Sequence, residues 1–416
     1  MSVKSAATLP SGFKRLAWSN LTAQSAEQIG LAAAPIVAVL TLQAGEGATG
    51  LLQTAQTLPF LLMSIPAGVL ADRMSRARLM AAAEALRVLS LLAITALIAT
   101  GALTLPLLAT IGFIGACGTV AFSVAAPALV PSLVAPVGLP VANARIELAR
   151  TSAFAAGPAL GGVLVGWIGG GPAFAVAAAL SAGAVALLAG ISKGKGALPP
   201  RPPAVRRHAL EEVRDGARFV LGHPLLRPIF ATQFVFNTAL FVIQAVYVPY
   251  AMHRLGLSPG GVGLTLAAFG AGMVVGAASA ARILRVVPLG MVIAIGPISG
   301  FVAALAMGLT ILVPSGVLAA ASFALMGAGP ILWVVSTTTL RQAVTPFDLL
   351  GRASAINSIA YGARPLGAAI GALIGALAGA EACLIVAAAG FAIQAAVILR
   401  SPAVRLERQP DAADAD

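Results

Sequence analysis

Charged residues are scarce in this chain, since only 10% of its 416 residues are Asp, Glu, Lys or Arg. Ordinary soluble domains carry about 25% charged residues, so this composition excludes a water-soluble globule with a polar shell. Acidic residues are the rarer kind, 14 against 26 basic ones, which gives a formal net charge of +12. Cysteine and histidine are nearly absent, with two and three residues.

These absences exclude several classes of protein. Cys117 and Cys383 both lie within apolar stretches, so they do not predict a disulfide framework. The histidines at positions 208, 223 and 253 are scattered without the spacing of metal ligands, and no phosphate-binding loop is found. We therefore expect no enzyme, no metal, no cofactor and no ATP-driven transport.

Long apolar runs are what the chain has in abundance, because 59% of its residues are hydrophobic and its mean hydropathy is +0.96. A membrane-spanning helix needs about 20 consecutive apolar residues, and closed barrels would show much shorter alternating segments. Twelve stretches qualify, near residues 16–41, 47–71, 79–100, 105–126, 146–168, 172–191, 227–251, 260–281, 289–312, 315–338, 355–379 and 381–400. The sequence therefore predicts an all-α membrane protein with twelve transmembrane helices in two six-helix bundles.

The basic residues are distributed unevenly between the loops. They gather in alternate loops, for example at Arg73, Arg76, Arg214 and Arg282, while the intervening loops hold essentially one, Arg254. Lysine and arginine concentrate in the cytoplasmic loops of membrane proteins. We therefore expect a multi-pass protein of the cytoplasmic (inner) membrane with both termini in the cytoplasm, and no nucleic-acid partner.

A polar interruption divides the chain into two halves. Its first part is rich in glycine, proline and basic residues, and residues 204–221 show the apolar spacing of an amphipathic helix on the membrane surface. A solvated spacer is an equally good interpretation. We expect bundles at 1–191 and 225–400, a cytoplasmic linker at 192–224 and a cytoplasmic tail at 401–416.

The halves resemble each other. Residues 68–78 align with residues 276–286 at an offset of 208, and Pro158 aligns with Pro365 at an offset of 207. Repeats of six spans with a near-constant offset are typical of transporters built from two related bundles. Ala280 replaces Asp72 in the second copy, so only the first copy keeps an acid.

The turn after the second span reads G-V-L-A-D-R-M-S-R-A-R from Gly68 to Arg78. It resembles the signature loop of the major facilitator superfamily, G-x-L-A-D-R-x-G-R-R. The resemblance implies a gating turn that includes Gly68, Asp72, Arg73 and Arg76, with Asp72 facing the start of helix eleven at residues 350–354 and its partial positive charge. The alternative is a solvated basic turn that only fixes topology.

Other segments extend the resemblance. Gly157, Pro158, Gly161 and Gly162 resemble the core of the G-P-x-x-G-G antiporter motif, in which proline and glycine bend the helix; a plain small-residue packing face is the alternative. Together with residues 127–134, 142–144, 351–355 and 362–367, they resemble the exporter branch that includes macrolide and tetracycline efflux proteins and enterobactin-type siderophore exporters.

Ionisable residues within membrane spans are functional candidates, because they are costly to bury. Glu27 has no cation within one turn of its own helix and is our first candidate for the coupling proton. Glu84 and Arg87 are three residues apart and indicate an ion pair, with a coupling role open. Arg364 either pairs with one of these carboxylates across the halves or meets an anionic substrate.

Uncharged polar residues within the spans are candidates for the lining of a central cavity, namely Asn20, Gln24, Gln53, Gln56, Gln233, Asn237, Gln244 and Asn357. Such a mixture of apolar and few polar groups suits a small amphiphilic substrate. Each of them could instead make a hydrogen bond between helices.

By resemblance we expect a monomeric secondary transporter in the lipid bilayer that exports small amphiphilic compounds in exchange for protons, by alternating access and with the proton gradient as its energy source. Two alternatives stay open: a facilitator or uniporter of lysophospholipid or metabolites, and a membrane sensor or scaffold that transports nothing.

Overall fold

Helices make up all of the regular structure that the computed structural model describes, which covers residues 10–135, 138–191, 209–346 and 360–408 and positions 349, 353, 356 and 357. The side chains at positions 64, 65, 69, 72, 140, 209–213, 281 and 361 lie outside the described part. The first half contains α1 (Ser11–Leu42), α2 (Glu46–Leu62), α3 (Ser64–Arg73), α4 (Arg76–Ala99), α5 (Leu105–Leu133), α6 (Leu139–Ile168) and α7 (Gly170–Ala189). The second half contains α9 (Leu226–His253), α10 (Pro259–Val286), α11 (Leu289–Leu309), α12 (Gly316–Val344) and α14 (Ala363–Leu399). The helix α8 (Ala209–Gly222) lies between the halves in the sequence, and the short 3₁₀ turns η2 (Ala360–Gly362) and η3 (Pro402–Arg405) precede and follow α14.

The described helices account for the twelve predicted spans. Ten of them are long and apolar enough to cross a membrane. The second span consists of α2 and α3, which are separated at Met63, and α14 contains spans eleven and twelve. These two spans meet at Gly379, whose φ of 80° lies in the left-handed region that glycine adopts without strain. The prediction of an all-α fold with twelve membrane helices is confirmed.

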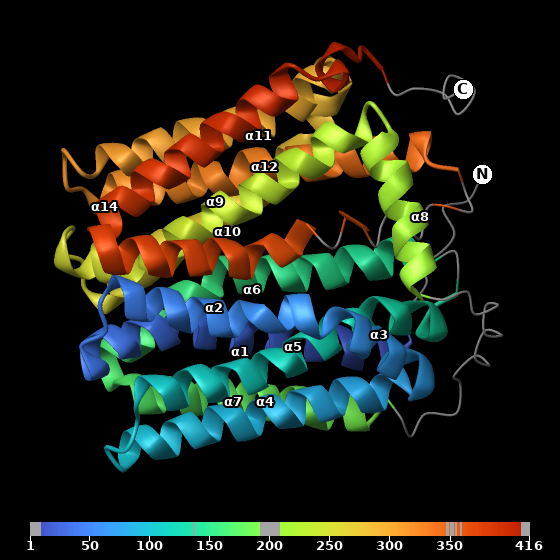
Figure 1. Ribbon diagram of the computed structural model, residues 1–416. Helices are drawn as coiled ribbons and strands as arrows, with labels where there is room; N and C mark the ends of the chain where they lie inside the picture. Colours follow the sequence, from blue (N-terminus) through green and yellow to red (C-terminus); the bar gives the residue numbers. More distant parts are fainter. Residues whose placement is uncertain are drawn as a thin grey trace.

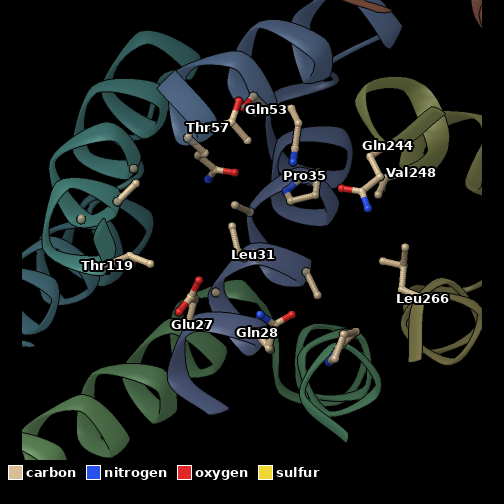
Figure 2. A pocket seen from close by; sticks show the side chains of 18 of the residues that line it. Glu27, Gln28, Leu31, Pro35, Gln53, Thr57, Thr119, Gln244, Val248 and Leu266 are labelled. Carbon is tan, nitrogen blue, oxygen red and sulfur yellow. Dashed lines mark hydrogen bonds between the residues drawn. The ribbon is translucent and has the colours of Figure 1, made fainter. Parts of the chain in front are cut away.

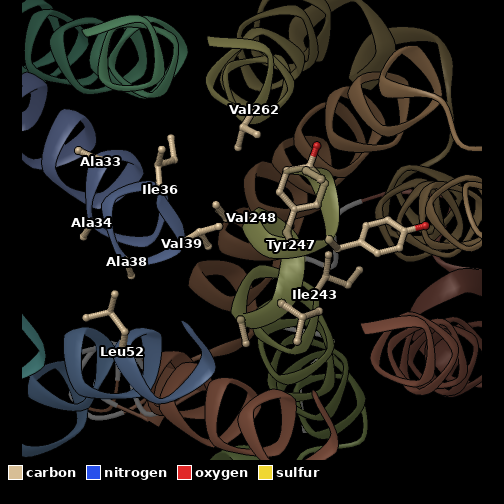
Figure 3. Close-up of a cluster of buried hydrophobic side chains, with 14 of the residues drawn as sticks. Ala33, Ala34, Ile36, Ala38, Val39, Leu52, Ile243, Tyr247, Val248 and Val262 are labelled. Carbon is tan, nitrogen blue, oxygen red and sulfur yellow. The ribbon is translucent and has the colours of Figure 1, made fainter. Parts of the chain in front are cut away.

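The hydrophobic core is continuous between the halves at one end of the molecule and divided at the other. One cluster joins the second part of α1 to α9, and Figure 3 shows Val39 of α1 beside Val248 of α9. At the opposite end, one cluster around Phe13 and Met80 belongs entirely to the first half and another around Trp333 and Leu340 entirely to the second. The halves therefore separate towards the end where both termini and α8 lie (Figure 1).

Two glycine-lined seams hold the joined end together. A Cβ on Gly50 of α2 would lie 2.5 Å from the Cα of Ala372 in α14. On the other side, a Cβ on Gly162 of α6 would lie 2.4 Å from the carbonyl oxygen of Pro259 and 2.8 Å from the Cα of Gly263, both in α10. Small residues allow helix backbones to approach this closely in a membrane, so both seams depend on glycine.

Valine at position 50 is expected to open the joined end. Its side chain would meet the backbone of Ala372, which cannot move aside, and such overpacking costs about 1–3 kcal/mol, or roughly a 5- to 150-fold change in the ratio of closed to open molecules. The measurement is the distance between spin labels at Thr41 and Leu312, with Cys117 and Cys383 replaced by alanine. We expect a longer distance to become populated.

The matched control is Gly183→Val in α7, because no atom of the described residues lies within 4 Å of a Cβ at Gly183. Its distance distribution should equal that of the native protein. An unchanged distribution in Gly50→Val would contradict the proposed role of this seam.

The linker helix and the tail both pack on the second half. Val220 of α8 and Ala403 of η3 belong to the same buried cluster as Trp333. The backbone N–H of Gly290 donates to the carbonyl oxygen of Leu406 at 2.8 Å, which satisfies one of the unpaired donors at the start of α11. Only the end of α8 is described to this level, so its predicted place on the membrane surface stays a prediction.

Candidate functional site

A cavity of about 300 Å³ lies between the two halves. Nine helices other than α14 contribute to its wall, and α14 contributes one residue, Arg364. Most of the wall is apolar, and its larger apolar side chains are Leu31, Phe60, Leu91, Ile94, Ile111, Phe154, Phe174, Leu240, Phe241, Val248, Leu266, Phe269 and Phe323. Apolar walls with a few polar groups are typical of sites for small molecules.

Arg87 is the centre of an ionic cluster in the wall formed by the first half. Its Nη1 lies 2.9 Å from Oε1 of Glu84, one turn away on α4, and its Nη2 lies 3.7 Å from Oε2 of Glu27 on α1. The guanidinium also donates to the carbonyl oxygen of Ala23 at 2.9 Å and to Oγ1 of Thr119 on α5 at 2.7 Å. One cation is thus shared by two carboxylates and is held by three helices.

The two carboxylates of this cluster differ in their access to the cavity. Glu84 is completely buried and does not line the cavity, whereas Glu27 lines it and its side chain is 15% exposed (Figure 2). Further charges that act on Glu27 come from Arg150 on α6 and Arg364 on α14. Glu84 therefore serves as the close partner of Arg87, and Glu27 is the carboxylate within reach of ions and ligands.

Arg364 faces the cavity from the opposite half, at the start of α14. Its guanidinium carbon lies 5.8 Å from the ring centre of Phe60 on α2 and 5.5 Å from that of Phe241 on α9. Its Nε donates to Oδ1 of Asn237 at 3.3 Å. Because Phe60 belongs to the first half, these cation–π contacts connect the halves beside the cavity.

The structure brings most of the predicted site residues together. Among the predicted charged residues and amides, Glu27, Arg87, Arg364, Gln53, Gln56 and Gln244 line the cavity; Glu84 and Asn237 lie one contact behind it, against Arg87 and Arg364. The cavity wall does not include Asn20, Gln24 or Gln233. Asn357 lines a different, very small cavity beside Val220 and Leu226, because it lies at the divided end of the molecule, so its predicted place in the central cavity is wrong.

The glycines of the G-P-x-x-G-G segment lie where helices pack. A Cβ on Gly157 would lie 2.3 Å from Cβ of Gln28, and one on Gly161 would lie 2.9 Å from the carbonyl oxygen of Ile29, both in α1. Gly162 faces α10 in the seam described above, and Pro158 lines the cavity. Through these glycines, α6 packs against α1 of its own half and against α10 of the second half. This arrangement favours the packing interpretation of the glycines.

The turn with the facilitator signature lies at the divided end. No atom of the described residues lies within 4 Å of a Cβ at Gly68. The gating role of this turn stays a prediction. Arg73 is exposed, and Arg76 donates to the carbonyl oxygen of Ala128 in its own half at 2.8 Å. The side chain of Asp72 and most of residues 350–354 lie outside the described residues.

Two residues of the site were missed from the sequence. Thr119 is one of four hydroxyl residues in the long apolar helix α5, and Phe60 is one of 16 phenylalanines. Threonine within a helix usually bonds to the preceding turn of its own backbone, so neither residue carries a signal by itself.

If Glu27 carries the predicted coupling proton, Thr119→Val is expected to change the pH dependence of the transport that the facilitator resemblance implies. In the native protein, Nη2 of Arg87 donates to Oγ1 of Thr119 at 2.7 Å and lies 3.7 Å from Oε2 of Glu27. Valine removes the acceptor, so this nitrogen is free to move closer to Glu27. A closer ion pair favours the ionised carboxylate, so the pH at half-maximal transport should move towards acid by about one unit, which corresponds to roughly 1.4 kcal/mol. The measurement is the pH profile of uptake into membrane vesicles.

Thr57→Val provides the matched control, because Thr57 also lines the cavity but donates to Gln53 of its own helix at 2.8 Å. Its profile should match that of the native protein, and Thr119→Ser, which keeps the hydroxyl, should do the same. A native profile in Thr119→Val would show that the hydroxyl does not position Arg87.

Two helical bundles with a central cavity between them define a transporter of the major facilitator type. A sequence profile described as "Transmembrane secretion effector" matches residues 14–415, and the chain belongs to this family. The Enterobactin exporter EntS of Citrobacter koseri is 31% identical over 243 residues, which are 58% of this chain and 55% of that protein. The chain therefore matches little more than half the length of this curated relative. The predicted facilitator family and the resemblance to exporters are confirmed.

Solved structures give the same fold. The inward-facing structure of a bacterial homologue of the iron transporter ferroportin is 14% identical, and the comparison covers 94% of this chain and 98% of that chain with a TM-score of 0.74. An outward-facing structure of a bacterial ferroportin homologue, 16% identical and with the same coverage, gives a TM-score of 0.62. At these identities the likeness concerns the fold alone.

Proposed function

We propose that this transporter exports small amphiphilic compounds in exchange for protons, by alternating access and without a cofactor. The observation that carries the proposal is the cluster of Glu27, Arg87 and Glu84 in the cavity wall. Two carboxylates within 4 Å of one guanidinium give this cluster a net charge of −1 in a region of low dielectric. A proton on Glu27 removes that charge, and the charge returns when the proton leaves.

The arrangement of the halves supports alternating access. The central cavity lies between a joined end, held by glycine seams, and a divided end. If the basic loops face the cytoplasm, as the positive-inside distribution predicts, the divided end faces the cytoplasm and the cavity receives its substrate from there. Both termini would then be cytoplasmic, and a monomer in the inner membrane would suffice for the cycle.

The composition of the cavity supports an amphiphilic substrate. Phenylalanine and aliphatic side chains form most of the wall, and charges are confined to Glu27, Arg87 and Arg364. The Citrobacter koseri relative is named as an exporter of enterobactin, so we take enterobactin as the first compound to test. A lipophilic cation such as ethidium is the second, because Glu27 could also bind a cationic group.

The test uses inverted membrane vesicles that contain the protein, in which export appears as uptake. We expect one of the two compounds to accumulate when a proton gradient is imposed, and accumulation to stop when an ionophore dissipates the gradient. Equal uptake with and without the gradient would mean facilitated diffusion and would exclude exchange with protons. Binding without flux of either compound would favour a sensor.

A further inference from the structure

The central cavity contains four glutamine side chains that make no hydrogen bond with the described part of the protein. They are Gln28 of α1, Gln53 and Gln56 of α2 and Gln244 of α9, and they come from both halves. Gln56 is 7% exposed, and its Oε1 is fully buried without a partner among the described residues. Burying such an oxygen unpaired is unfavourable, so these amides differ from ordinary structural glutamines.

A proline adds a further acceptor to the same wall. Pro35 of α1 has no N–H, so the carbonyl oxygen of Leu31 lacks its usual helical donor. Both residues line the cavity, and Figure 2 shows Gln53 and Gln244 on either side of Pro35, with Glu27 and Gln28 further along α1. Several side-chain amides and the helix turn with the unpaired Leu31 carbonyl thus lie along one part of the cavity wall.

The backbone around Gln56 leaves room for its amide. A Cβ on Gly112 of α5 would lie 3.2 Å from Nε2 and 3.3 Å from Cγ of Gln56. Gly112 therefore allows α5 to pack against this side chain while the amide stays at the cavity wall. The position of Gln56 is thus fixed by α2 and α5, which belong to the same half.

From these contacts we propose that Gln53, Gln56 and Gln244, with the Leu31 carbonyl, form a neutral subsite that binds hydroxyl or amide N–H groups of the substrate. Carboxamides accept and donate hydrogen bonds without charge, so this subsite selects uncharged donor groups. The aromatic walls at Phe241, Phe269 and Phe323 bind the apolar body of the same molecule. The substrate class is therefore an aromatic amphiphile with several hydroxyl or amide groups. This inference rests on the proposed export from the cavity.

A pair of probes that differ only in donor groups tests the subsite. One probe is 2,3-dihydroxybenzoylserine and the other is its 2,3-dimethoxy analogue, which has the same ring, amide and carboxylate but lacks the phenolic donors. Dissociation constants are measured with the full chain in lipid nanodiscs. Sites built to hydrogen-bond a group reject an analogue that lacks it, so we expect the native protein to bind the dihydroxy probe at least about tenfold more tightly.

The variants Gln56→Met and Gln244→Met should each reduce this preference to about threefold or less, because methionine fills the volume of glutamine without its amide. Gln394→Met is the matched control. Gln394 is 1% exposed, also has an unpartnered Oε1 among the described residues, and lies away from the cavity with its Nε2 3.5 Å from the carbonyl oxygen of Pro297. The control should keep the native preference.

Each outcome decides the proposal. An undiminished preference in both cavity variants would overturn it, as would native protein that binds the two probes equally or binds neither of them. If thermal unfolding shows no cooperative transition for Gln56→Met, the variant is not folded, and Gln53→Met replaces it in the same comparison. Selective binding by the native protein without flux of the dihydroxy probe in vesicles would leave the subsite in place and overturn the proposed export instead.

Discussion

Glu27→Gln is expected to abolish accumulation of substrate driven by a proton gradient while leaving substrate binding measurable. The amide keeps the shape of the carboxyl group but cannot exchange a proton, and Glu27 is the carboxylate of the ionic cluster that lines the cavity. Gradient-driven accumulation should fall at least about 100-fold, to the level of empty vesicles, since general acid–base groups of this kind contribute factors of roughly 10² to 10⁴. Exchange of labelled for unlabelled substrate should continue, because it needs no net proton movement.

Glu147→Gln is the control for this experiment. Glu147 forms an exposed ion pair with Arg150 on α6, 2.5 Å apart, and it does not line the cavity. Its variant should accumulate substrate as the native protein does. Gradient-driven accumulation that survives in Glu27→Gln but is lost in Glu84→Gln would move the proton to the buried carboxylate.

Arg87→Met is expected to destabilise the first half strongly. The substitution leaves Glu84 completely buried without its cation, and it also removes the donors to Ala23 and Thr119. Removing one partner of a buried ion pair costs about 3–5 kcal/mol. We expect thermal unfolding in detergent at a clearly lower temperature, with much less folded protein recovered from the membrane.

A double variant separates the pair from the rest of the cluster. Glu84→Leu combined with Arg87→Met replaces both charges by apolar groups, and such replacements are often neutral for stability. The double variant should therefore recover most of the stability lost in Arg87→Met and remain unable to couple transport to protons, because Glu27 no longer has its cation. If the double variant is as unstable as the single one, the two residues do not stabilise the fold as a pair.

Most of the fold could be predicted because a membrane imposes strong rules on sequence. Each span must be apolar over about 20 residues, so the helices appear directly in the hydropathy pattern, even where α14 joins two spans at Gly379. The break at Met63 in the second span could not be seen, since α2 and α3 together have the composition of one helix. Hydropathy records burial in lipid and not the continuity of a helix.

The site was predictable only in part, and the reason is geometric. Glu27, Arg87 and Arg364 are unusual within apolar spans, so composition alone identifies them as candidates. Their partners depend on how helices distant in sequence pack together. The hydroxyl of Thr119, the ring of Phe60 and the displacement of Asn357 from the cavity all follow from contacts between helices that no single span records.

Proton movement during transport is the most direct test of the account. Proteoliposomes that contain the native protein and a trapped pH-sensitive dye are given an outward gradient of the transported compound. We predict that the lumen acidifies as substrate leaves, at a rate that saturates with substrate concentration, and that Glu27→Gln vesicles show no acidification. Substrate efflux from native vesicles at an unchanged internal pH would contradict the assignment of Glu27 and of proton exchange.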